Sequence, residues 1–156
     1  METNEKLIEE LNGLIEINND RVNGYEKAIE ETKDLDMDMR AIFRSMANDS
    51  SAYSNELAAV VSGLGGTPAD GTTNIGKVYR VWMDIKTTFT SHDRQSVLEL
   101  CEFGEDAAQK AYKDAIASDA NMDVDTRQLI TGQQAKLKTS HDLIKKYRDA
   151  HKAVNA

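Results

Sequence analysis

The feature that most constrains the fold is the distribution of helix-breaking residues. The chain of 156 residues contains one proline, Pro68, which lies in the glycine-rich segment SGLGGTPADGTTN at residues 62–74. A proline inside a helix removes a backbone hydrogen bond and clashes with the preceding turn. Long helices are therefore permitted on both sides of this segment, and the sequence predicts an all-α protein with one strong loop signal.

Apolar residues recur every three or four positions on both sides of the loop, which is typical of amphipathic helices that bury one face. The predicted helices span about residues 4–32, 36–62, 75–89, 94–118 and 124–154. Asp123 is placed to cap the last of them. The first helix is expected to bury Leu7, Leu11, Leu14, Asn18, Val22, Tyr25 and Ile29. The last helix is expected to bury Ile130, Gln134, Leu137, His141, Ile144 and Arg148.

The lengths of the connections predict how the helices are arranged. Short turns near residues 34–35 and near residue 120 force the helices on either side of each turn to be antiparallel neighbours. The connection between the second and third long helices has about 30 residues, including a short helix of its own. We therefore expect one domain, residues 1–156, folded as an antiparallel ferritin-like four-helix bundle with a short crossover helix. The alternative is a plain up-down bundle with an appended helix.

The composition limits the partners and the compartment. Asp and Glu number 27 against 19 Lys and Arg, which gives a formal net charge of −8. Phosphate contacts need clustered basic residues, so such a chain is a poor ligand for nucleic acid or an anionic membrane surface. Cys101 is the only cysteine, and the sequence shows neither a signal peptide nor a membrane-spanning apolar run. We expect a cytoplasmic protein with no nucleic-acid or membrane partner.

Each long helix carries a polar residue within its apolar stripe, namely Asn18, Ser50, Glu105 and His141. Counted from the short turns at about 1.5 Å per residue, the first three lie near one height and His141 within about two turns of it. Lys138, one turn earlier on the last helix, is closer still. An ionised Glu105 buried alone would be costly, so it needs a metal ion, a cationic partner or a bound proton. The sequence thus predicts a buried polar layer across the bundle.

Three separated segments carry a resemblance to a known family: LIEINNDRVNGYEKA at residues 14–28, Trp82-Met83-Asp84, and GEDAAQKAY at residues 104–112. In this order they resemble a bacterial family of uncharacterised four-helix-bundle proteins, known as a domain of unknown function and assigned to the ferritin-like superfamily. The resemblance extends from Leu7 to about Asp149. It implies a fold distantly similar to rubrerythrin and bacterioferritin, and it implies no activity.

In such relatives a di-iron site takes one Glu from each of two helices and a Glu-x-x-His pair from each of the other two. Rubrerythrin-like helices often place a Tyr seven residues after the single Glu, as Tyr25 follows Asn18 and Tyr112 follows Glu105 here. The resemblance assigns the ligand positions to Asn18, Ser50, Tyr53, Glu105, Lys138 and His141. Only Glu105 and His141 keep a ligand of the relatives' kind. Because two hard cations need several carboxylates, these departures argue against oxidase, peroxidase and iron-storage activity.

Three interpretations of the layer stay open. In the first, Lys138 supplies the positive charge that a metal supplies in the relatives, and it joins Glu105 and His141 in a closed network with the other polar residues. In the second, Lys138 extends outward to solvent and Glu105 meets only water. In the third, Glu105 and His141 hold one metal ion, although two protein ligands are few for a tight site.

The sequence offers two functional hypotheses. No phosphate-binding loop, catalytic triad or CxxC motif appears, so we expect no enzymatic activity, no cofactor and no metal. The first hypothesis is a non-enzymatic, interaction or stress-associated protein that binds a second copy of itself or another protein. Its candidate docking patch comprises Lys77, Tyr79, Arg80 and Trp82, although an amphipathic crossover helix can equally just pack on the bundle. The second hypothesis is a ferritin-like metalloprotein with a degenerate site at Glu105 and His141.

Overall fold

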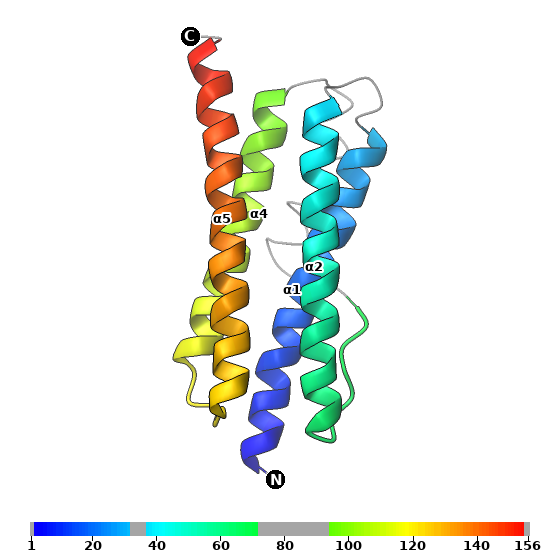
Figure 1. Cartoon of the computed structure of the whole chain (residues 1–156), viewed down its shortest axis with the longest axis vertical. Coiled ribbons are helices and arrows are strands. Elements are labelled where there is room, and N and C mark those ends of the chain that lie inside the picture. The colour runs from blue at the N-terminus through cyan, green and yellow to red at the C-terminus, as the bar shows by residue number, and fades with distance from the viewer. Residues whose placement is uncertain (1, 32–36, 72–93, 155–156) are drawn as a thin grey trace.

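A computed structural model describes residues 2–31, 37–71 and 94–154, which form four α-helices (Figure 1). These are α1 (Glu2–Glu31), α2 (Met37–Gly63), α4 (Arg94–Ala117) and α5 (Val124–Val154). No strand occurs among these residues, so the predicted all-α four-helix bundle is confirmed. Within the same residues, no helix is both long enough and apolar enough to cross a membrane. The predicted helix at 75–89 and the candidate docking patch of Lys77, Tyr79, Arg80 and Trp82 lie outside the described residues.

The directions of the helices follow the order that the connection lengths predicted. In Figure 1, α1 and α5 run upward, whereas α2 and α4 run downward. The most extensive packing is between α1 and α2 and between α4 and α5, and α1 also packs on α4. Because α2 and α4 are parallel, the connection between them joins opposite ends of the bundle. An up-down-down-up bundle with one long crossover is the result.

The end of α2 is a glycine turn at the start of the predicted loop. Gly65 has a φ of 84°, and its N–H donates to the Ser62 carbonyl oxygen at 3.0 Å. The N–H of Gly66 donates to the Val61 carbonyl oxygen, also at 3.0 Å. A left-handed residue followed by such a pair of bonds closes a helix C-terminus, and glycine adopts it without strain. Gly66 also approaches α1 closely, since a Cβ there would lie 2.8 Å from the Ile8 side chain.

The chain after this turn runs back along α1. Asn12 donates to the Thr67 carbonyl oxygen at 3.1 Å and accepts from the Ala69 N–H at 2.8 Å. Two turns further along α1, Asn19 donates to the Gly71 carbonyl oxygen at 2.8 Å. This segment lies outside a helix, so its backbone groups need other hydrogen-bond partners, and side-chain amides of α1 supply them. The first part of the crossover is therefore held against α1.

The turn between α4 and α5 is set by a capping residue. The Thr126 N–H donates to Asp123 Oδ1 at 2.8 Å, and hydrogen bonding to the side chain of Thr126, followed by this backbone bond, lowers the pKa of Asp123. The predicted cap is confirmed, because a carboxylate at this position satisfies a backbone donor of the first turn. An ion pair between Lys6 and Asp119 joins the start of α1 to the same turn.

The core consists of two apolar clusters at different heights in the bundle. The lower cluster includes Leu7, Leu11, Leu14, Leu57, Val61, Tyr112, Ile130 and Leu137. The upper cluster includes Tyr25, Ile29, Met39, Phe43, Met46, Leu98, Cys101 and Ile144. The rings of Tyr25 and Phe43 lie 5.5 Å apart between centroids in the upper cluster. Burial of these stripes supplies the main driving force for folding, and it leaves one polar level between them.

Candidate functional site

A layer of buried polar side chains separates the two apolar clusters. Asn18, Arg21, Ser50 and Glu105 have no exposed surface. On each helix they lie between residues of the lower and the upper cluster. The common height that the sequence predicted for Asn18, Ser50 and Glu105 is therefore confirmed. Tyr53 is also buried, as a member of the lower cluster.

The centre of the layer is an ion pair between α1 and α4. Arg21 Nη2 lies 2.5 Å from Glu105 Oε1, and both side chains have no exposed surface. The Tyr25 hydroxyl donates to the same oxygen at 2.5 Å. The other terminal nitrogen of Arg21 donates to the Ser50 hydroxyl of α2, and the guanidinium lies 5.5 Å from the centroid of the Tyr25 ring. Arg21 therefore links three helices at one point.

The pair is held by one carboxylate oxygen only. Among the described residues, Oε2 of Glu105 and Nε of Arg21 have no hydrogen-bond partner. A fork-to-fork arginine–carboxylate contact would use both oxygens. Loss of the Arg21 contact would consequently leave the Glu105 carboxylate with the Tyr25 hydroxyl alone.

Burial and pairing set the protonation states of the layer. Burial acts to lower the pKa of Arg21, but the charge of Glu105, the neighbouring Tyr25 and the hydrogen bond to Glu105 together raise it, so the guanidinium stays charged. Burial, followed by the Glu105 charge, raises the pKa of Tyr25 well above its usual 10.0, so the phenol stays a donor. The same two causes raise the pKa of the free Cys101 thiol. A thiol in that state is a poor nucleophile, so Cys101 acts as a small core residue.

A second buried network lies just below the ion pair. Asn18 Nδ2 donates to the Leu14 carbonyl oxygen at 2.9 Å and to the Tyr112 hydroxyl at 2.8 Å. The Tyr112 hydroxyl donates in turn to Gln133 Oε1 at 2.6 Å. Gln133 Nε2 donates to the Tyr53 carbonyl oxygen of α2 at 3.4 Å. This chain of bonds connects all four helices.

The two tyrosines noted for their sequence spacing make reciprocal contacts. Tyr25, seven residues after Asn18 on α1, reaches Glu105 on α4. Tyr112, seven residues after Glu105 on α4, reaches Asn18 on α1. Because α1 and α4 are antiparallel, equal spacing on each helix brings each tyrosine opposite the other helix's polar residue. The polar positions of α1 and α4 are therefore equivalent in the bundle.

Two predicted members of the layer lie elsewhere. Lys138 is exposed, and its ammonium donates to Asp142, one turn along α5, at 3.0 and 3.3 Å. The predicted pairing of Lys138 with Glu105 is wrong, because Arg21 fills that position from α1. Lys138 does extend to solvent, but Glu105 meets Arg21 and Tyr25. His141 has the predicted height, yet its ring contacts Asp106 and Asp142 at the edge of α4 and α5, whereas Glu105 contacts Arg21, so the alternative in which Glu105 and His141 hold one metal ion is also wrong.

The residues that sequence reasoning missed are Arg21 and Gln133. A strict alternation of four and three residues from Leu7 along α1 arrives at Arg21, whereas Val22 was expected inside and is only partly buried. The same alternation on α5 selects Gln133 in place of Gln134. The signal was present in the heptad spacing. Arg21 and Gln133 were nevertheless not predicted to be buried, because arginine and glutamine are mostly exposed residues.

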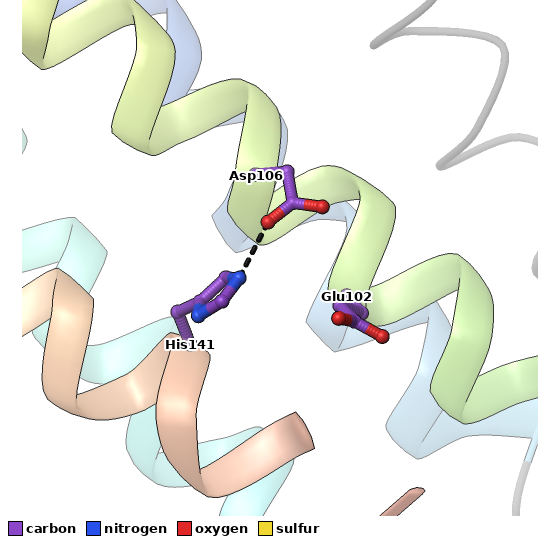
Figure 2. Close-up of side chains that lie close together, drawn as sticks. All are labelled: Glu102, Asp106 and His141. Atoms are coloured by element: carbon purple, nitrogen blue, oxygen red, sulfur yellow. Dashed lines mark hydrogen bonds and ion pairs between the residues drawn. The ribbon is translucent and has the colours of Figure 1, made fainter.

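A second group of titratable side chains lies at the solvent edge of the α4–α5 interface (Figure 2). Glu102 and Asp106 are one helical turn apart on α4, and His141 of α5 contacts Asp106 through Nε2. One ligand atom from each of these three side chains lies within 4.8 Å of the others. The His141 side chain is 18% exposed and that of Asp106 is 61% exposed. This group, unlike the ion pair of the core, can be reached from solvent.

Arg148 borders this second group. Its Nη1 contacts Glu102, and its Nη2 lies 2.8 Å from Asp149. Hydrogen bonding to Asp149, followed by the charge of Glu102, raises the pKa of Arg148 against the effect of burial. Arg148 was expected to lie on the inward stripe of the last helix, and it is partly buried at this edge. Glu102 thus has a cationic neighbour on one side and the Asp106–His141 pair on the other.

Comparison with known proteins identifies the family of the chain. The family model described as a domain of unknown function (DUF2383) matches residues 6–118, which is most of the chain. Comparison with curated proteins gives no match. The matched residues include the whole ion-pair centre, Arg21, Tyr25, Ser50 and Glu105, whereas α5 lies beyond them. The chain belongs to the DUF2383 family of domains of unknown function.

Proposed function

We propose that this protein is a non-enzymatic bundle of the ferritin-like superfamily in which a buried arginine–glutamate pair stands where relatives hold a di-iron centre. It acts through its surface, on a second copy of itself or on another protein, in a cytoplasmic and stress-associated role. One observation carries the proposal. Glu105, to which the resemblance assigns a ligand position of di-iron relatives, is fully buried and paired with Arg21.

The charges of the layer support a metal-free core. A di-iron site needs several carboxylates to neutralise two hard cations. The ion pair of the layer contributes one carboxylate, Glu105, and the guanidinium of Arg21 already offsets its charge. A metal ion entering beside Arg21 would add positive charge to a site of low dielectric, which is costly.

The burial of the layer supports a non-catalytic core. A general acid or base must come within hydrogen-bonding reach of its substrate. The side chains of Arg21, Tyr25 and Glu105 have no exposed surface, so no substrate touches them without opening the bundle. The raised pKa values of Tyr25 and Cys101 also keep both groups protonated, so neither is an activated nucleophile beside Glu105.

The arrangement of the helices supports the ferritin-like assignment. The up-down-down-up order requires one long crossover, as in ferritin-like bundles. The reciprocal contacts of Tyr25 with Glu105 and of Tyr112 with Asn18 make α1 and α4 equivalent. The resemblance implies this equivalence, because it assigns to each of these two helices one position that supplies a single Glu ligand in di-iron relatives.

The test is metal content and iron chemistry. Protein purified without chelators is expected to carry no stoichiometric iron or manganese in its core, and Fe²⁺ added without oxygen is expected to oxidise after aeration no faster than in buffer. Glu105→Gln is the matched variant for the core, and Asp106→Asn is the matched variant for the surface. Iron oxidation that Glu105→Gln abolishes and Asp106→Asn leaves intact would overturn the proposal.

Self-association is tested separately by sedimentation equilibrium over a wide range of protein concentration. A second copy as partner predicts a mass that rises with concentration toward a dimer or a larger closed assembly. A monomer at every concentration would remove the second copy and leave another protein as the partner.

A further inference from the structure

The group at the edge of α4 and α5 has the composition of a metal site. Glu102 and Asp106 stand one turn apart, which places both carboxylates on one face of α4, and His141 faces them from α5 (Figure 2). The three ligand atoms lie within 4.8 Å of one another. We propose that Glu102, Asp106 and His141 bind one divalent metal ion of the zinc class.

The distances suit a single small ion. Zinc bonds of about 2.0–2.2 Å to nitrogen and oxygen separate tetrahedral ligand atoms by about 3.4 Å. Ligand atoms that already lie within 4.8 Å of one another reach this separation by side-chain rotations that move them by about an ångström. Two carboxylates offset the charge of the ion, and the imidazole nitrogen favours zinc over calcium, which takes six or more oxygens. Three protein ligands leave the fourth position to water.

A contact outside the three ligands orients the imidazole. His141 Nδ1 lies 3.2 Å from Asp142 Oδ1. Asp142 is held in turn by Lys138, whose ammonium donates to both of its carboxylate oxygens at 3.0 and 3.3 Å. When Nδ1–H donates to Asp142, the lone pair of Nε2 points toward Asp106 and Glu102. Metal-binding histidines usually have such a carboxylate partner on the second ring nitrogen.

Arg148 sets the expected strength of the site. Its contact with Glu102 competes with a metal ion for the same carboxylate. Asp149 offers the guanidinium another partner at 2.8 Å, so Arg148 can release Glu102 without losing every charged contact. A three-ligand, partly exposed site with a cationic competitor is expected to bind zinc in the micromolar range rather than the nanomolar range.

This site is separate from the core in the fold. Asp106 follows Glu105 directly in α4, yet Glu105 points to Arg21 inside the bundle and Asp106 points to His141 at its edge. The proposed function can therefore fail while this site survives, and the reverse also holds.

The experiment is a calorimetric titration of the folded full-length chain with Zn²⁺ at neutral pH, repeated with Co²⁺ to read the coordination geometry from its visible spectrum. One ion per chain is expected, with a tetrahedral Co²⁺ spectrum. His141→Gln, Asp106→Asn and Glu102→Gln are each expected to weaken binding at least about tenfold. Arg148→Gln is expected to tighten it about tenfold, because the competing cation is removed.

Two control variants separate a built site from adsorption of metal on an acidic surface. Asp114→Asn removes an exposed carboxylate elsewhere on α4, and Glu105→Gln removes the core carboxylate. If the three ligands form the site, Asp114→Asn leaves the affinity unchanged, and so does Glu105→Gln in protein that circular dichroism shows to be folded. Binding that exceeds one ion per chain and falls equally in all these variants would overturn the proposal, as would binding that His141→Gln leaves intact.

Discussion

Substituting Arg21 with methionine removes the positive charge of the polar layer while keeping much of the apolar volume of the side chain. Glu105 then retains the Tyr25 hydroxyl as its hydrogen-bond donor, since its second oxygen has no partner among the described residues. Removing one partner of a fully buried pair costs about 3–5 kcal/mol of folding free energy. Both side chains of this pair have no exposed surface, so solvent screening does not reduce that cost.

The complementary substitution is Glu105→Gln, which leaves Arg21 as a buried, unpaired cation and is expected to cost about as much as Arg21→Met. The double variant buries no net charge, and its glutamine can still accept from Tyr25. It is expected to lie within about 2 kcal/mol of the wild type, because replacing both members of a buried pair is often nearly neutral. The resulting coupling free energy is therefore several kcal/mol.

Urea unfolding followed by circular dichroism measures all four proteins of the cycle. Lys138→Met is the matched control, because the sequence alone suggested Lys138 as the partner of Glu105 and the structure places it in solvent. Its unfolding midpoint should stay unchanged. A single variant that does not fold, next to a double variant that does, also supports the pairing. Additive costs, or a cost below about 1 kcal/mol for Arg21→Met, would refute the reasoning.

Three further predictions concern residues around the layer and the loop. Burial raises the pKa of Tyr25 well above 10.0, so this tyrosine ionises at a lower pH in the unfolded chain than in the folded protein. Its contribution to stability is therefore complete below about pH 10 and falls as pH rises further. Tyr25→Phe should reduce the alkaline slope of the unfolding free energy by about 1.4 kcal/mol per pH unit. Tyr112→Phe removes the hydroxyl that donates to Gln133 and accepts from the Asn18 amide. Urea unfolding should show that the free energy of unfolding falls by about 1–3 kcal/mol. Gly65→Ala places a side chain on a residue with a φ of 84° and should lower the free energy of unfolding by about 1 kcal/mol. Gly63→Ala, at the end of α2 where a Cβ has nothing within 4 Å, should raise it by up to about 1 kcal/mol. Equal effects at both positions would contradict the turn geometry.

The architecture followed from the sequence because its signals were local. A single proline in a glycine-rich segment marked the end of α2, and Gly65 there has the left-handed backbone that such a segment permits. Asp123 marked the start of α5 through a cap between neighbouring residues. Helices of such length with a regular apolar stripe have no competing secondary structure, so their existence was fixed before any tertiary contact was known.

The candidate sites were harder to predict because they depend on the rotation of each helix. One residue corresponds to a turn of about 100° around the axis, so choosing Val22 in place of Arg21 left the cation out of the core. The same error on α5 exchanged Gln134 for Gln133. Height along the bundle was predicted correctly for His141, but its direction depends on how α5 packs against α4. Composition could not reveal that Glu102 and Asp106 would face it.

The polar layer also explains how this bundle can distinguish its own alignment from neighbouring ones. An apolar stripe repeats every turn, so sliding one helix by about 5.4 Å along another exchanges one set of apolar contacts for a similar set. The same slide would part Arg21 from Glu105 and leave two charges buried without partners, at several kcal/mol. It would also part Asn18 from Tyr112, which lies on the same pair of helices. An ion pair that adds little net stability therefore still favours one register of α1 against α4, and the reciprocal tyrosines make that preference act at two heights at once.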